Sequence, residues 1–360
     1  MRIAVAGTLA GLGGIQIQLG AVARVLADAG HEVLLLSFGN AGSGANNAAV
    51  EALRSHRAIR VEFVGAGGAV ATLLAVRRVL KQFGPEIYFA CGTGWNLFAG
   101  AILCRVPMLV FHEVMSGESY GWRDSRNLVR RFFHRVVAQA QPVADNFARS
   151  FDWKHPIEVL PAFAQALEGR VAVSKHTVPL GAAKAAIFGR LVPHKRVAWL
   201  VTQWPRLKAG LRELHIHGTG PEEPIIRDLI AKHRLGGAVF LHGAYPSGGA
   251  YAELLSHYDV TLLPTVGAEG APLVLLESMA CGVPFVATDA GGIRDYDNPD
   301  CIVTSVGDSE DFLNGVETLA NRLAHGDIDQ QRLQTFYDSH FSQEALAPRW
   351  KAFFNSLPHS

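Results

Sequence analysis

Residues 3–37 read IAVAGTLAGLGGIQIQLGAVARVLADAGHEVLLLS and contain one complete repeat of a parallel sheet. The short apolar run Ile3–Ala6 predicts a buried strand, Gln16–Ala29 has the pattern of a helix, and Glu32–Ser37 is a second apolar run. A strand, a helix and a further strand in this order are typical of a βαβ unit, whose two strands lie parallel. This part of the chain is therefore predicted to be α/β.

The same alternation continues through the chain. In the N-terminal half, apolar runs recur at Ile87–Ala90 and Met108–Phe111. A second set of predicted strands comprises Ala185–Phe188, Glu213–His217, Ala238–His242, Val260–Pro264 and Pro284–Thr288. Predicted helices follow at Glu222–His233, Pro272–Cys281, Phe312–Ala324 and Gln343–Phe354. We expect an α/β protein with two doubly wound, Rossmann-like domains that face each other across a cleft, where ligands meet the carboxyl ends of the strands.

The length of 360 residues suits two domains of roughly 150–200 residues each. Around Ala166–Ala183 the chain has no amphipathic pattern, which is typical of a linker. We predict an N-terminal domain over residues 1–170, a linker over 171–183 and a C-terminal domain over 184–340. Residues 341–360 are predicted to form a last helix, for which a return to the N-terminal domain is one option.

Composition narrows the class of protein. The chain is 49% hydrophobic and 18% charged, with a net charge of +1, which excludes disorder, collagen and a general polyanion-binding protein, so no nucleic-acid partner is expected. Ile3–Ala23 and Ile87–Cys104 carry no charge and approach the length of a membrane span, but their glycines favour a strand, a loop and a buried helix. The first residues lack the pattern of a signal peptide, and the four cysteines form no C-x-x-C pair. We expect a cytoplasmic protein with free thiols.

The glycine-rich loop after the first strand does not fit a dinucleotide site. From Gly11 the G-x-G-x-x-G pattern ends on Gln16, and no acid follows the second strand, so NAD binding is disfavoured; a P-loop is absent. Gly13 and Gly14 precede a helix whose first N–H groups attract anions. The pair can serve an anion contact or simply a tight turn.

Two segments of the C-terminal half carry the chemistry. Arg190 and Lys195 follow the strand Ala185–Phe188 and can converge on one anion, a pairing suited to a diphosphate. In residues 267–284, GAEGAPLVLLESMACGVP, Pro272 suits a helix start and Gly282 a helix end. Glu269 and Glu277 then flank the helix-start amides of Gly270, Ala271 and Leu273. An anion seat between two carboxylates suits a ligand with hydroxyl groups on both sides of a phosphate, such as a sugar nucleotide.

These residues resemble the retaining glycosyltransferases of family four (glycosyl transferases group 1), which have the GT-B fold. The likeness spans nearly the whole chain and includes Gly13–Gly14, residues 111–113 (Phe-His-Glu), residues 189–195, residues 218–221 (Gly-Thr-Gly-Pro), residues 239–243 and the Glu269/Glu277 pair. It departs from the family at Val159–Phe163, which lacks the usual Asn-Gly, and at Glu113, where Asp is common.

The resemblance implies a role for each matched residue. Arg190 and Lys195 hold the leaving diphosphate, Glu269 and the amides after it hold the donor sugar and phosphate, and Glu277 binds the ribose. Phe240–Tyr245 borders the base, and His112 lies beside the anomeric carbon. His112 and Glu269 are the candidate catalytic residues. Fixed cations and amides stabilise the charge of a leaving diphosphate, so no metal and no cofactor beyond the UDP- or GDP-linked sugar is expected.

Alternative sites carry weaker patterns. Asp295-Tyr296-Asp297 matches a metal-binding D-x-D but does not follow an apolar strand directly. His215 and His217 share one face of a strand, yet no third ligand is spaced nearby, so packing is favoured over zinc. No Gly-x-Ser-x-Gly motif indicates a hydrolase.

A cluster of arginines is relevant to the kind of acceptor and to where the protein lies in the cell. Arg123, Arg126, Arg130 and His134 recur at three- and four-residue spacing, which predicts a basic amphipathic helix, and Arg131 and Arg135 lie beside them. The helix can lie on an anionic membrane, as a peripheral protein at the inner face of the plasma membrane, or simply face solvent. Residues 1–180 hold 18 Lys and Arg against 12 Asp and Glu, and residues 181–360 hold 15 against 20, so the first half is the basic one.

The sequence thus predicts a metal-independent, retaining glycosyltransferase of the hexosyltransferase type. Its acceptor is expected to be a glycan or a lipid-linked sugar, in the synthesis of cell-surface polysaccharide, lipopolysaccharide or glycolipid. A sugar-nucleotide 2-epimerase and a catalytically silent sugar-nucleotide-binding protein remain as alternatives.

Overall fold

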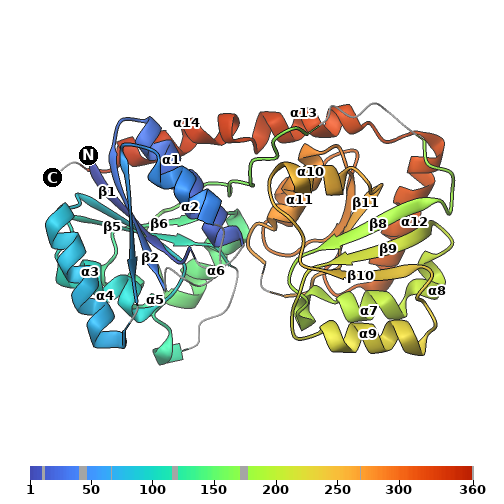
Figure 1. Cartoon of the computed structure of the whole chain (residues 1–360), viewed down its shortest axis with the longest axis horizontal. Coiled ribbons are helices and arrows are strands. Elements are labelled where there is room, and N and C mark those ends of the chain that lie inside the picture. Colours follow the sequence, from blue (N-terminus) through green and yellow to red (C-terminus); the bar gives the residue numbers. More distant parts are fainter. Residues whose placement is uncertain are drawn as a thin grey trace. The chain divides into compact units, whose positions relative to one another are not determined.

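A computed structural model describes residues 1–9, 13–39, 47–65, 67–115, 121–170, 177–267 and 269–358, without the side chains of residues 47–49. The chain divides into two compact units, one formed by Met1–Phe163 with Gln343–Ser360 and the other by Ala164–Ser342. Each unit is a parallel sheet with helices on both faces (Figure 1), which confirms the predicted fold class of two doubly wound α/β domains.

The first unit contains a seven-stranded sheet in the order β3-β2-β1-β4-β5-β6-β7. Its strands are β1 (Arg2–Gly7), β2 (Glu32–Phe38), β3 (Ile59–Val64), β4 (Ile87–Cys91), β5 (Met108–Glu113), β6 (Arg135–Ala138) and β7 (Ile157–Val159). Its helices are α1 (Gly14–Asp28), α2 (Asn47–Arg54), α3 (Ala69–Phe83), α4 (Trp95–Leu103), η1 (Gly121–Arg123), α5 (Arg126–Phe132), α6 (Gln141–Phe151) and α14 (Gln343–Ser356).

Alternation along the central strand β1 builds a core on each face of this sheet. Ile3 and Val5 pack into a cluster with residues of α1 and α14, whereas Ala4 and Ala6 pack into a second cluster with residues of α3 and α4. Because both faces are covered, the strand is apolar at every interior position, which is why β1 is a continuous hydrophobic run in the sequence.

The second unit contains a six-stranded sheet in the order β10-β9-β8-β11-β12-β13. Its strands are β8 (Ala183–Phe188), β9 (Leu211–His217), β10 (Val239–Gly243), β11 (Val260–Leu263), β12 (Phe285–Thr288) and β13 (Ile302–Thr304). Its helices are η2 (Pro193–Lys195), α7 (Val197–Thr202), α8 (Trp204–Leu207), α9 (Glu223–Lys232), α10 (Gly249–Leu255), α11 (Leu273–Ala280), η3 (Ile293–Tyr296), α12 (Ser309–His325) and α13 (Gln330–His340).

The units divide at different residues from those expected. The second unit begins at Ala164 rather than after a linker at 171–183, because Gln165 donates a hydrogen bond to Glu277 and Arg170 donates one to the carbonyl of Ala280. Residues 171–176 of the expected linker lie outside the described residues. The last helix, α14, belongs to the first unit, where Trp350 is fully buried and donates its indole N–H to the carbonyl of Pro161.

The prediction of one basic amphipathic helix is wrong. Arg123 lies in η1, only Arg126, Arg130 and Arg131 lie in α5, and Arg135 begins strand β6. Arg126 cannot reach a membrane or solvent because it is 4% exposed and holds ion pairs to carboxylates. The helix ends early because β6 must pair with β5 inside the sheet.

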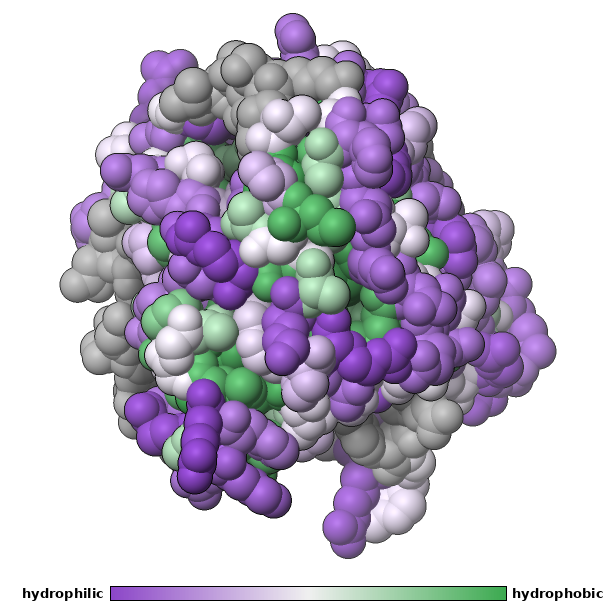
Figure 2. Space-filling view, turned by 90° about the vertical axis from the view of Figure 1, so that its right-hand side faces the viewer, coloured by the Kyte–Doolittle hydropathy of each residue, from purple (hydrophilic) through white to green (hydrophobic). Residues whose placement is uncertain are grey.

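In the part of the chain that the structure describes, we find no helix that combines the length and the apolar character needed to cross a membrane. On the face shown in Figure 2, hydrophobic residues reach the surface in a few patches, each bordered by hydrophilic residues. The uncharged stretches Ile3–Ala23 and Ile87–Cys104 contain a strand followed by the start of a helix, as the sequence predicted.

Candidate active site

Loops that follow four strands of the second sheet pack closely at its carboxyl edge. The loop after β8 lies against the loop after β9, where a Cβ on Gly218 would overlap the carbonyl of Gly189. The loop after β12 lies against the loop after β11, where a Cβ on Gly291 would overlap the carbonyl of Glu269, and Gly292 donates a 2.7 Å hydrogen bond to Gly270. Glycine is needed at these contacts because a side chain would separate the loops. The four loops therefore form one platform.

Lys195 and Glu269 meet on this platform. The Nζ atom of Lys195 lies 2.6 Å from Oε1 of Glu269, and the Thr265 hydroxyl donates to the same oxygen at 2.8 Å. Val266 donates its backbone N–H to the carbonyl of His194, which ties the two loops together. The side chains of Lys195 and Glu269 are 15% and 9% exposed, so the ion pair is shielded yet within reach of a ligand.

Arg190 is exposed directly beyond β8. Its charge, like that of Lys195, acts to lower the pKa of His194; burial is the main cause of that lowering, and Glu269 opposes it. All four groups therefore lie near one another, while the convergence of Arg190 and Lys195 on one anion stays a prediction. The histidine is neutral at pH 7, so the cations of this cluster are the arginine and the lysine.

The N-terminus of helix α11 lies at the platform. Pro272 is the residue before the first turn, one position earlier than predicted, and Gly270 and Ala271 lead into it. The first N–H groups of a helix, here from Leu273 onward, have no acceptor within the helix and carry a partial positive charge. A helix N-terminus thus follows Glu269, which is paired with Lys195, and the binding of an anion there stays a prediction.

Glu277 lies inside α11 and is 2% exposed. Gln165 donates a 3.0 Å hydrogen bond to its Oε1 and accepts one from the backbone of Gly248. Burial raises the pKa of Glu277 to about 7, against the hydrogen bond from Gln165, which lowers it. The carboxyl group is therefore partly protonated at neutral pH and able to donate as well as accept hydrogen bonds.

In the first unit, Gly13 and Gly14 form the start of α1. Gly13 is the residue before the first turn, in an extended conformation, and Gly14 is the first helical residue. Residues 10–12 of this loop lie outside the described residues. Gly13 accepts hydrogen bonds from Gln16 and Ile17 and so works as a helix start, while an anion contact there stays a prediction.

His112 lies one residue before the end of strand β5 and is completely buried. Its ring packs against Phe89 and Trp350, with centroids 5.5 Å and 5.4 Å away, and neither ring nitrogen has a hydrogen-bond partner among the described residues. Burial lowers the pKa of His112 to about 3, so the ring is neutral. A buried polar ring with no partner is costly unless a ligand or water satisfies it.

The structure explains why position 113 carries Glu rather than the shorter Asp. Its carboxylate accepts a 2.9 Å hydrogen bond from Nη1 of Arg126, and Asp124 holds the other side of the same guanidinium at 2.7 Å. All three side chains are buried. These ion pairs hold the end of β5 to the start of α5.

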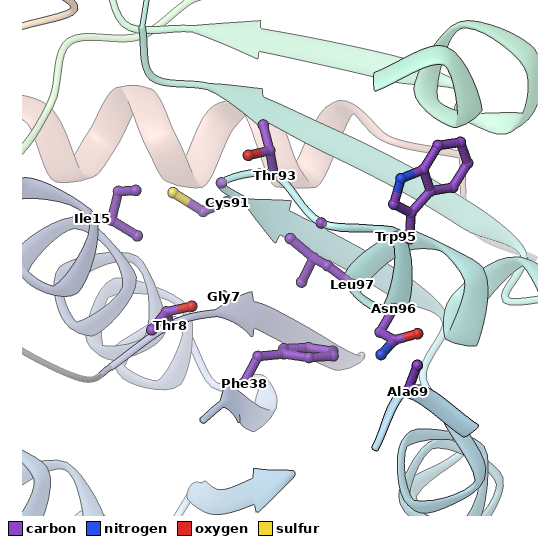
Figure 3. Close-up of a pocket in the computed structure, with 12 residues that line it drawn as sticks. Gly7, Thr8, Ile15, Phe38, Ala69, Cys91, Thr93, Trp95, Asn96 and Leu97 are labelled. Carbon is purple, nitrogen blue, oxygen red and sulfur yellow. The ribbon is translucent and has the colours of Figure 1, made fainter. Parts of the chain in front are cut away.

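A cavity of about 520 Å³ opens at the carboxyl ends of β1, β2 and β4 in the first unit (Figure 3). It lies where the strand order reverses between β1 and β4, the usual place for a ligand in such sheets. Its lining comes from the strand ends and from α1, α3 and α4: Gly7, Thr8, Ile15, Phe38, Ala69, Cys91, Gly92, Thr93, Gly94, Trp95, Asn96 and Leu97. Sequence reasoning missed it, although the run Gly92-Thr93-Gly94 after an apolar strand was a usable signal.

The D-x-D pattern does not form a paired carboxylate site. Tyr296 between the two acids is buried, and the carboxylate of Asp297 lies 3.7 Å from Arg294. Asp295 is exposed, and desolvation together with the nearby charge of Asp289 raises its pKa.

Comparison with known proteins gives matches along most of the chain. Residues 12–164 match the family described as Glycosyltransferase Family 4, and residues 182–322 match the family described as Glycosyl transferases group 1.

Two curated relatives align with parts of the chain. The exopolysaccharide phosphotransferase SCO2592 of Streptomyces coelicolor is 31% identical over 185 residues, which are 47% of this chain and 18% of that protein. The putative colanic acid biosynthesis glycosyltransferase WcaL of Escherichia coli K12 is 39% identical over 114 residues, which are 30% of this chain and 27% of that protein. The chain thus spans less than a third of the length of either relative.

Among solved structures, Anabaena Alr3699/HepE in complex with UDP-glucose matches with a TM-score of 0.77 and 17% identity, covering 99% of this chain and 100% of that one. At that identity the likeness shows the fold alone.

Proposed function

Because this chain belongs to the group 1 and family 4 glycosyltransferases and has their GT-B fold, we propose that it moves a sugar from a nucleotide-diphosphate donor to a glycan or lipid-linked acceptor with retention of anomeric configuration. The observation that carries the donor assignment is the cluster of Arg190, Lys195 and Glu269 at the start of α11. A UDP- or GDP-linked sugar is the donor class.

In this proposal the second unit holds the donor. Lys195, Arg190 and the first amides of α11 bind the diphosphate and stabilise the negative charge that grows on it as the bond to the sugar breaks. These groups are fixed before the donor arrives, so they need little reorganisation. Glu269 orients Lys195 and accepts hydrogen bonds from sugar hydroxyls, and Glu277 binds the ribose. The chemistry assigned to these residues needs no metal.

His112 is proposed to satisfy its ring nitrogens with the donor sugar. The ring is neutral, so it acts through hydrogen bonds and through its backbone carbonyl rather than as a cation. The two unpartnered nitrogens support this assignment.

The cavity of the first unit is proposed to receive the acceptor. Trp95 and Phe38 offer aromatic surface to the apolar face of a sugar ring, and Asn96 and Thr93 offer hydrogen bonds to its hydroxyls. The WcaL match supports a role in cell-surface polysaccharide synthesis.

A peripheral membrane contact is proposed for a smaller set than the five arginines of the sequence prediction. Arg123, Arg130 and Arg131 are exposed, and Trp122 is 81% exposed with the Arg123 guanidinium 5.0 Å from its ring centre. Cations beside an exposed tryptophan are typical of surfaces that contact anionic lipid.

The proposal is tested by donor binding followed by transfer. A thermal-shift screen against UDP, GDP, ADP and their sugars identifies the nucleotide, and transfer is then measured for Lys195→Ala, Glu269→Gln and the control Lys208→Ala on the same unit. We expect transfer to fall by about 10²–10³-fold in the first two variants and to be unchanged in the control. Full transfer by Lys195→Ala would overturn the site assignment.

Two further measurements separate the alternatives. An epimerised sugar nucleotide, formed from the donor without any acceptor, would identify a 2-epimerase. If the donor stabilises the protein but is neither transferred nor slowly hydrolysed, the protein is a silent binding protein. Retention is read from the anomeric configuration of the product by NMR.

A further inference from the structure

Three histidines gather on one face of the second sheet, on β9 and its edge neighbour β10. His215 and His217 point to the same side because side chains alternate along a strand. Phe240 of β10 pairs with His215 of β9, so alternation along β10 brings His242, two residues on, to the same face of the sheet. The expectation that no third ligand is near is therefore wrong. One ring nitrogen from each histidine lies within 4.8 Å of the others.

His215 and His242 meet edge to edge. Nδ1 of His215 lies 2.9 Å from Nε2 of His242, the ring planes differ by 3°, and the ring centres are 5.1 Å apart. Two coplanar rings at this separation share one proton between facing nitrogens. A metal ion bound to both nitrogens would replace that hydrogen bond.

Glu213 holds the far side of the His215 ring. Its Oε2 lies 3.0 Å from Nε2 of His215, and its Oε1 is bound by Arg212 at 2.7 Å. With the N–H of Nε2 donated to the carboxylate, the lone pair of Nδ1 is directed at His242. A carboxylate behind a histidine in this way is the usual support of a metal-ligating ring.

His217 supplies the third nitrogen from the buried side of the cluster. Its ring lies parallel to that of His242, with centres 4.5 Å apart, and Tyr258 bonds to its Nε2 at 2.7 Å. His217 is buried and His242 is exposed, so the cluster has a fixed inner side and an open outer side through which an ion can enter.

We propose that His215, His217 and His242 bind a divalent transition-metal ion of the zinc class, with Glu213 as the outer support. Zn–N bonds of about 2.0–2.1 Å in a tetrahedral site separate two nitrogens by about 3.3 Å. The nitrogens of His215 and His242 need to move apart by about 0.4 Å from their present 2.9 Å, and both rings must turn so that their lone pairs converge on the ion. His217 joins them by turning its ring. No step of the proposed transfer passes through this ion.

The test is a titration of the full chain with ZnCl₂ in competition with a chromophoric chelator. We expect one site in the wild-type protein, with affinity at least tenfold weaker in His242→Ala and in His215→Ala. Glu213→Gln should weaken it by about 10–100-fold. His233→Ala is the matched control, because His233 is an exposed histidine of the same unit outside the cluster, and it should leave the affinity unchanged.

Cobalt gives an independent readout of geometry. Co²⁺ in a site with nitrogen ligands and low coordination number absorbs strongly in the visible, and we expect this band in the wild type and its loss in His242→Ala. Equal Zn²⁺ affinity in His242→Ala and the wild type would overturn the proposal, because the binding would then come from scattered surface histidines. His242 is exposed, so its variant tests the site without disturbing the core.

Discussion

Glu277 allows a prediction that joins stability to function. Its carboxyl group is buried in α11, and burial raises its pKa from 4.5 to about 7. Replacing it with Gln keeps the shape and keeps an oxygen for the hydrogen bond from Gln165, but removes the charge. The variant should therefore be relieved of a penalty that the wild type bears whenever Glu277 is ionised in the folded state.

The sign and size follow from proton linkage. Between pH 4.5 and 7 the folded protein holds a proton on Glu277 that the unfolded chain has released, so the stability of the wild type falls as pH rises through this range. A shift of about 2.5 pKa units corresponds to about 3 kcal/mol, since each unit is worth about 1.4 kcal/mol. Below pH 4.5 both states are protonated and the difference vanishes.

The measurement is urea unfolding of the wild type and of Glu277→Gln at pH 5 and pH 8, followed by circular dichroism. We expect the Gln variant to gain up to about 3 kcal/mol over the wild type on going from pH 5 to pH 8. Glu253→Gln, an exposed carboxylate on α10 of the same unit, should show no such gain. An equal difference at both pH values would refute the assigned burial of the charge.

The same variant should lose function. Under the proposed function Glu277 binds the ribose hydroxyls, so Glu277→Gln should raise the KM for the donor while it raises stability at pH 8. A gain in stability with a loss in activity is the usual sign of a strained functional group. A stabilised variant with unchanged donor KM would remove Glu277 from the donor site.

Three further predictions concern other parts of the chain. Arg126→Ala leaves the buried Glu113 carboxylate without its main cation and should cost about 3–5 kcal/mol in urea unfolding, whereas an exposed arginine would cost little. Gly291→Ala places a Cβ against the carbonyl of Glu269 at a φ of +61°, which costs about 1–2 kcal/mol from backbone conformation alone, and calorimetry should show weaker donor binding. Trp95→Ala should raise the acceptor KM and leave the donor KM unchanged; a change in the donor KM alone would contradict the acceptor assignment.

The sequence predicted most of the buried central strands and the edge strand β10 but missed β3, β6, β7 and β13. β1 and β4 are covered on both faces and appear as continuous apolar runs. β3 lies at the sheet edge, and its Arg60 and Glu62 interrupt the apolar pattern, so it was not predicted. Edge strands carry polar side chains because one flank meets solvent.

The site was predictable where it depends on spacing within one segment. Glu269 and Glu277 are eight residues apart, and a helix start between them fixes their separation. The contact between Lys195 and Glu269 joins two loops far apart in the chain, and only the sheet order brings β8 beside β11. The approach of His242 to His215 joins residues 27 positions apart, and only the pairing of β10 with β9 brings them together.

Under the proposed function, the charges at the platform indicate why a helix start is needed there. Arg190 and Lys195 supply two positive charges, and Glu269 removes one by its ion pair with Lys195. A diphosphate carries at least two negative charges, so these side chains alone do not neutralise it. The amides at the start of α11 supply the remainder without adding a mobile group. Burial that keeps Glu277 partly protonated near pH 7 prevents a second full negative charge beside the phosphates. Raising the pH above 8 ionises Glu277 completely and should weaken nucleotide binding in the wild type more than in Glu277→Gln.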